Sequence, residues 1–117
     1  MRLRFPKSAR LNRAAEFAKV KAEGVTSHGR YLLLGSLQTA EDQPAKIGLV
    51  TSRRLGGAVV RNRVRRRLRE LARKSRPELK PGVQLVIIAR PSAVKASFDQ
   101  LQQDWLRACE RAGIFKA

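Results

Sequence analysis

The amino-acid sequence predicts a single α+β domain in which helices pack against a small mixed β-sheet. Three observations lead to this fold class. The chain has 117 residues, the size of one domain. Its hydrophobic share of 43% is close to the globular norm. Apolar residues alternate along the chain between helical spacing and short strand-like runs, in the order helix, two or three strands, helix, strand, helix. We therefore treat residues 1–117 as one domain.

The first predicted helix follows an N-terminal arm. Residues 1–11 are basic and interrupted by a proline, so we expect them to be extended. Asn12 can cap a helix that runs to about Glu23, and Gly24 suits the left-handed position that ends a helix. Four residues share one face of this helix by their three-and-four spacing: Ala14, Phe17, Ala18 and Lys21.

Strand signals follow in residues 25–28, 30–37 and 45–52. Residues 41–44 are polar and end in proline, which predicts a hairpin connection between the last two strands.

The strongest element is a helix over residues 58–75, which should stop before Pro77. A narrow apolar stripe runs along it through Val60, Val64, Leu68 and Leu71. Arg61 lies at the margin of the stripe. The opposite arc is covered by six further arginines: Arg63, Arg65, Arg66, Arg67, Arg69 and Arg73.

A buried strand and a last helix complete the chain. Residues 83–89 are apolar and β-branched, as in a central strand. Because a helix separates them from the strand at 45–52, the two strands can pair in parallel. Ser97 and Gln100 form a capping box for a helix that ends at Gly113. Its apolar stripe consists of Phe98, Leu101, Trp105, Ala108, Cys109 and Ala112.

The net charge points to a polyanionic partner. With 26 basic and 9 acidic residues the formal charge is +17, which destabilises a compact chain unless a partner neutralises it. Nucleic acid is the first expectation and an anionic membrane surface the second. Arginine is preferred over lysine, 18 to 8. Guanidinium binds phosphate in bidentate fashion, so this preference favours phosphate recognition over mere solubility.

Several classes of protein are disfavoured. The longest apolar runs are too short to span a bilayer, and the N-terminus lacks the apolar stretch of a signal peptide. A single cysteine and a single histidine exclude an internal disulfide and a zinc site, and they predict a reduced cytoplasm. A nucleophilic pair of Cys109 and His28 stays formally open, although the helical stripe favours a buried thiol. The nine acids are scattered and predict neither a metal site nor a catalytic pair.

The arginine helix is the predicted binding element. If six to eight phosphates contact it, log K should fall with log salt at a slope of roughly −4 to −7. Asn62 can either reach a ribose or base edge or cap the helix. Gly56 and Gly57 either expose backbone N–H groups to an anion or simply make a tight turn. Among the aromatic residues, Phe17 and Tyr31 are the candidates for stacking on bases, with a core role as the default for Phe17.

The residues at 52–70, from Ser-Arg-Arg-Leu-Gly-Gly-Ala-Val-Val to Arg-Asn-Arg-Val-Arg-Arg-Arg-Leu-Arg-Glu, resemble the signature of the bacterial ribonuclease P protein subunit. Three shorter motifs occur in family order on either side. They are Glu16-Phe17-x-x-Val20, Gly29-Arg30-Tyr31 and Ile88-Ala89-Arg90-Pro91.

This resemblance implies an αβββαβα sandwich with a left-handed βαβ crossover, similar to ribosomal protein S5 domain 2, where the handedness rule alone predicts a right-handed one. It also implies that the chain partners a catalytic RNA, which with Mg²⁺ removes the 5′ leader of precursor tRNA. The Mg²⁺ would be held mainly by RNA.

The resemblance also implies two sets of site residues. The set that would contact the RNA subunit is Arg53, Arg54, Arg61, Asn62, Arg63, Arg65, Arg66 and Arg69. The set that would line a cleft for the single-stranded leader is Phe17, Lys21, Leu32, Leu34 and Arg54.

The sequence departs from the family in this cleft. Many members carry a second phenylalanine where Lys21 stands, and an aromatic residue where Leu34 stands. Strand alternation places Leu32 and Leu34 on one face and Tyr31 and Leu33 on the other, so Tyr31 cannot replace the missing ring. We therefore expect leader binding to depend more on charge and less on stacking.

Three other functions compete with this one. A small ribosomal protein would have equal charge and copurify with ribosomal RNA. An architectural DNA-binding protein would bind duplex DNA as well as structured RNA at matched salt. A stand-alone nuclease would cleave RNA with Mg²⁺ in the absence of an RNA subunit.

Overall fold

The computed structural model describes residues 10–11, 14–40 and 42–116. The predicted arm lies outside these residues except for Arg10 and Leu11, and the predicted cap Asn12 lies outside them as well. Leu11 donates its backbone N–H to the carbonyl of Ile47 at 3.1 Å, so the described end of this segment runs beside the sheet.

The sheet has four strands in the order β1-β2-β4-β3, where β1 is Val25–His28, β2 is Leu32–Gln38, β3 is Lys46–Val50 and β4 is Val83–Ala89. The central strand β4 pairs antiparallel with β2 and parallel with β3, so the sheet is mixed as predicted. β1 pairs antiparallel with β2.

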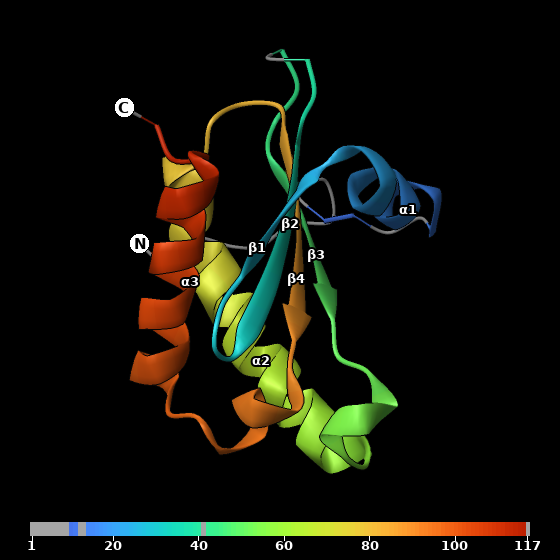
Figure 1. Ribbon diagram of the computed structural model, residues 1–117, viewed down its shortest axis with the longest axis vertical. Helices are drawn as coiled ribbons and strands as arrows, with labels where there is room; N and C mark the ends of the chain where they lie inside the picture. The colour runs from blue at the N-terminus through green and yellow to red at the C-terminus, as the bar shows by residue number, and fades with distance from the viewer. Residues whose placement is uncertain (1–9, 12–13, 41, 117) are drawn as a thin grey trace.

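Helices cover both faces of this sheet (Figure 1). α1, Ala14–Glu23, lies on one face, and α2, Ala58–Ser75, and α3, Phe98–Ala112, lie on the other. The element order αβββαβα and the α+β fold class are confirmed. The parallel strands β3 and β4 are joined through α2, which is the predicted strand–helix–strand unit.

The predicted hairpin between the strands at 30–37 and 45–52 is wrong. β4 lies between β2 and β3 and hydrogen-bonds to both of them. The segment around residues 42–44 therefore connects two strands that are not neighbours. Local turn chemistry shows that the chain bends there, but it does not say which strand pairs with which.

The main core lies between the sheet and the pair α2 and α3. Leu68, Leu85 and Leu101 are fully buried in it, and so is Trp105, as the stripe of α3 predicted. The indole Nε1 of Trp105 donates to the hydroxyl of Ser75 at 2.5 Å, which fastens α3 to the end of α2. A smaller cluster of Leu11, Val20 and Val86 fills the space beneath α1.

Asp104 on α3 is a buried carboxylate that organises the start of β2. Its oxygens accept backbone hydrogen bonds from Arg30 at 2.9 Å, Tyr31 at 2.9 Å and Leu32 at 3.0 Å. The strand begins at Leu32 and not at the predicted residue 30, and these contacts hold the turn before it against α3. In the sequence this acid is only one of nine scattered carboxylates.

The bounds predicted for α2 and the cap predicted for α3, which rest on residues close together in sequence, are confirmed. α2 spans the predicted residues 58–75, with Val64, Leu68 and Leu71 buried along its stripe. α3 has the predicted capping box at Ser97, and Gly113 adopts the left-handed conformation at φ 65°.

α1 differs from its prediction in two ways: in how the helix ends and in which of its residues are buried. Gly24 is not left-handed. A Cβ there would lie 2.4 Å from the carbonyl oxygen of Ser36 and 2.5 Å from that of Val20, so close backbone approach is what requires glycine. Of the face predicted for this helix, Phe17 is half-buried and Ala14, Ala18 and Lys21 are exposed, while Val20 carries the burial. The short helix contacts the sheet through fewer residues than its spacing indicated.

Candidate nucleic-acid interface

The outer face of α2 is an exposed cationic surface. Asn62, Arg63, Arg65, Arg66 and Arg69 are all exposed, and Arg61 is half-buried. Among the described residues of α2, the ion pair that forms is between Arg73 and Glu70, close to the end of the helix. The exposed arginines closer to its beginning, Arg63, Arg66 and Arg69, therefore face solvent, as a surface for phosphate groups requires.

Two arginines of α2 hold the helix in place. Arg65 donates to the buried hydroxyl of Thr51, with its Nη2 at 2.9 Å and its Nε at 3.3 Å. Arg67 donates to the carbonyl of Ala96 at 2.7 Å. The first contact ties the helix to the end of β3, and the second ties it to the segment before α3. Arg65 keeps an exposed side chain and remains in the candidate interface.

A tight turn leads into α2. A short 3₁₀ helix, η2, spans Arg53–Leu55 with Arg53 and Arg54 exposed and Leu55 buried. Gly56 follows with φ 136°, a conformation that favours glycine. The alternative of a tight turn is therefore the one that the structure supports at this position. Gly57 is the N-cap of α2 in an ordinary extended conformation. Asn62 therefore does not cap the helix. Its amide is exposed, as a contact with a ribose or a base edge requires.

An apolar cleft of about 320 Å³ lies between α1 and the sheet. Phe17 and Lys21 line it from α1, as the resemblance implied. α1 also contributes Val20, and the sheet contributes Thr26, Leu33, Gly35, Val50, Val86 and Ile88.

The placement of Leu32 and Leu34 in this cleft is wrong. Both side chains are 1% exposed and belong to the main core on the opposite face of the sheet. The β2 residues that face the cleft are Leu33 and Gly35, one position along. Helices pack their apolar sides against both faces of the sheet. The alternation of side chains in β2 therefore did not reveal which of the two faces lines the cleft. Arg54, in η2, is not among the residues that line the cleft.

Tyr31 also lies outside the cleft. It precedes β2, packs against the main core, and carries the guanidinium of Arg30 over its ring at 5.4 Å from the centroid. Phe17 is therefore the aromatic side chain that lines the cleft.

A second hollow joins the cleft to the arginine helix. This edge hollow has a volume of about 190 Å³ and lies along β3. Its lining is Arg10, Leu11, Phe17, Ile47, Gly48, Leu49, Arg65 and Arg69. Phe17 lines both spaces, and its ring lies so close over β3 that a Cβ on Gly48 would be 2.6 Å away. The two hollows thus meet at Phe17, and Arg65 and Arg69 of α2 line the second of them.

The described residues offer no set of carboxylate, histidine or thiol groups that fits a metal ion. Asp104 is occupied by backbone N–H groups, and Glu70 is paired with Arg73. Cys109 is buried, and burial raises the pKa of its thiol, so it stays protonated and unreactive. In the part of the chain that is described, no helix is long and apolar enough to cross a membrane.

The chain is similar to known proteins over most of its length. The family model described as Ribonuclease P matches residues 5–113. The ribonuclease P protein component of Syntrophomonas wolfei is 31% identical over 109 residues, covering 93% of this chain and 91% of that protein. The same component of Gluconacetobacter diazotrophicus is 41% identical over 106 residues, covering 90% and 91%.

Solved structures share the fold. The RNase P protein of Staphylococcus aureus superposes with a TM-score of 0.85 at 24% identity, covering 94% of this chain and 100% of that one. The RNase P protein of Thermotoga maritima gives a TM-score of 0.77 at 23% identity, covering 87% and 96%.

Proposed function

The chain belongs to the ribonuclease P protein family, and on this premise we propose how its surfaces divide the work of the ribonucleoprotein. As the protein component it takes part in tRNA processing beside an RNA subunit that carries the catalysis. α2 binds that RNA, and the cleft beside α1 receives the 5′ leader of precursor tRNA. The alternative of a small ribosomal protein is not favoured by the family match.

One observation supports the RNA-binding role most directly: the exposed face of α2 carries arginine with almost no acidic partner. Crowded guanidinium groups repel one another by a few tenths of a kcal/mol for each like pair at i, i+4. Phosphates relieve this repulsion and accept bidentate hydrogen bonds. The proposed contacts are Arg53, Arg54, Arg61, Asn62, Arg63, Arg65, Arg66 and Arg69.

The cleft supports a different contact. A single strand carries unpaired bases, which need an apolar or aromatic surface, and phosphates, which need a cation. Phe17 and the sheet residues supply the apolar surface, and Lys21 supplies the charge. We propose that Leu33 takes the place that the resemblance gave to Leu32 and Leu34.

We infer that the Mg²⁺ required for cleavage is held mainly by RNA phosphates, since the described carboxylates are dispersed or already engaged. The site of action that we propose is the cytoplasm, in line with the buried, unpaired thiol of Cys109.

The direct test of function is reconstitution. The protein is added to RNase P RNA at a Mg²⁺ concentration too low for the RNA to act alone, and precursor-tRNA cleavage is measured. We expect cleavage to appear at the mature 5′ end. Absence of cleavage, with ribosomal RNA bound more tightly than RNase P RNA, would reject the proposal in favour of the ribosomal alternative.

Leader binding gives a second prediction. Lys21→Ala should weaken the affinity of the reconstituted enzyme for leader-bearing precursor by about fivefold at 0.1 M salt, because one phosphate contact on a single strand changes the salt slope by about 0.7. The readout is precursor affinity at several salt concentrations, and a substrate with no leader is the control. A severe loss in Phe17→Ala combined with no loss in Lys21→Ala would show that stacking dominates instead.

A further inference from the structure

A third hollow lies at the far end of α2, away from the turn at Gly57. This proline pocket has a volume of about 340 Å³. Its described lining is Pro44, Ala45, Arg73, Arg76, Pro77, Leu79, Pro81 and Lys116, and these described residues include three cations and no acid. No residue of α1 contributes to it, so it is separate from the cleft.

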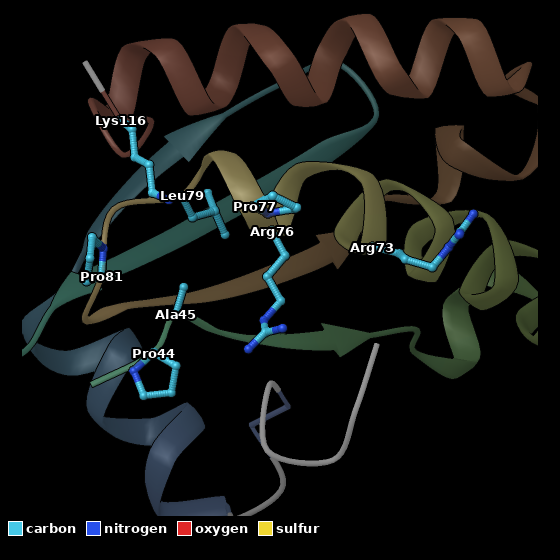
Figure 2. A pocket seen from close by; sticks show the side chains of 8 residues that line it. All are labelled: Pro44, Ala45, Arg73, Arg76, Pro77, Leu79, Pro81 and Lys116. Atoms are coloured by element: carbon cyan, nitrogen blue, oxygen red, sulfur yellow. The ribbon is translucent and has the colours of Figure 1, made fainter. Parts of the chain in front are cut away.

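Arg76 carries a polar group that the described residues do not satisfy. It follows the last residue of α2, and its Nε is buried without a hydrogen-bond partner among residues 10–11, 14–40 and 42–116. A buried N–H donor without an acceptor is unfavourable, and such a group in a hollow calls for an outside acceptor. Figure 2 shows the Arg76 side chain extending from the end of the helix toward Ala45 and Pro44.

Lys116 supplies a second cation from the opposite wall. Its backbone is anchored because its N–H donates to the carbonyl of Glu78 at 2.7 Å. Its side chain lies by Leu79 and Pro81 in Figure 2. Arg73 is committed to Glu70 and points away from the other two, so we assign the charge of this pocket to Arg76 and Lys116.

The pocket lies in line with cations already assigned to RNA. Arg65 and Arg69 line the edge hollow, and Arg73 and Arg76 follow at the helical spacings of four and three. Both hollows flank β3, one along Ile47 to Leu49 and the other at Ala45. From Arg65 to Arg76 the rise is about 17 Å at 1.5 Å per residue.

We propose that the proline pocket binds one nucleotide of the RNase P RNA. Arg76 and Lys116 take its phosphate, with the Arg76 Nε–H donating to a phosphate oxygen. The rings of Pro44, Pro77 and Pro81 lie against its ribose or base. This contact rests on the proposed function and extends the RNA-binding surface beyond the segment at 52–70 to the C-terminal end of α2.

The test compares two charge-matched double variants of the full chain. One is Arg76→Gln with Lys116→Gln. The other, Arg107→Gln with Arg111→Gln, removes two exposed cations of α3. Affinity for transcribed RNase P RNA is measured across salt concentrations. We expect the salt slope of the pocket variant to be less negative by about 0.7 to 0.9 and its affinity at 0.1 M salt to fall about five- to eightfold, because the two cations share one phosphate and each lost phosphate contact removes about 0.7 to 0.9 from the slope. The α3 variant should match the wild type.

Two further arms keep the outcome specific. Arg76→Lys retains the charge but not the Nε donor, so it should recover the salt slope and only part of the affinity. The affinity of the reconstituted pocket variant should fall by the same factor for precursor tRNAs with long leaders and for those with short leaders. Equal slopes in the two double variants would overturn the proposal, and so would a loss confined to long leaders, which would assign the pocket to the leader. If the wild type itself bound no RNase P RNA, the proposed function would fail instead.

Discussion

The variant Arg63→Gln with Arg66→Gln should bind RNase P RNA about 10- to 100-fold more weakly than the wild type at 0.1 M salt. Both side chains are exposed on the outer face of α2, and neither makes an ion pair with the acid Glu70 that engages Arg73. Each lost phosphate contact should make the slope of log K against log salt less negative by about 0.7 to 0.9. Filter binding over a salt series measures both quantities.

The control for this result is the α3 variant, Arg107→Gln with Arg111→Gln, which lowers the net charge by the same amount. If the two variants lost affinity equally, binding would follow net charge and not the α2 face. The thermal midpoint of the α2 variant should stay close to that of the wild type, since its two side chains point into solvent and relief of like-charge repulsion is worth only a few tenths of a kcal/mol.

Asp104→Ala should lower the free energy of unfolding by about 3–5 kcal/mol. The substitution removes the acceptor of three backbone N–H groups, of which that of Leu32 is buried. It also releases the contact that holds the β1–β2 turn against α3. Denaturant unfolding of the isolated protein, followed by circular dichroism, measures the loss.

Asp104→Asn is the matched comparison. It keeps the size and one oxygen acceptor but places an amide N–H₂ group against backbone donors, so we expect roughly half of the loss seen for alanine. A change below about 0.5 kcal/mol in the alanine variant would contradict a structural role for this carboxylate. RNA affinity of the folded fraction should not change in either variant, since Asp104 lies inside the fold and not on the α2 surface.

The two predictions concern residues that the sequence revealed unequally. The arginines of α2 stand out because one sign of charge repeats at helical spacing. Asp104 gave only an indirect signal, because its three partners are 72 to 74 residues away and are backbone groups common to every residue. An isolated acid on the apolar side of a predicted helix is the feature that points to such a role: Asp104 precedes the buried Trp105 on α3.

The lining of the cleft beside α1 was predicted in part. Phe17 and Lys21 line it, and they come from one short helix whose own spacing places them together. Leu32 and Leu34 do not, because a strand covered on both faces alternates between two buried environments. The proline pocket was not predicted at all. Its lining comes from the segments before β3, after α2 and before β4, and from the end of the chain.

The features that could be predicted from sequence depend on neighbours along the chain: the extent of α2, the cap of α3, the cationic face and the family motif. Each follows from interactions within one or two helical turns. Tertiary structure alone decided that β4 enters between β2 and β3, that Gly24 is required by the nearby Ser36 carbonyl, and that Leu33 and not Leu34 faces the cleft. These outcomes depend on contacts between distant segments, and such contacts are selected by the packing of the whole core.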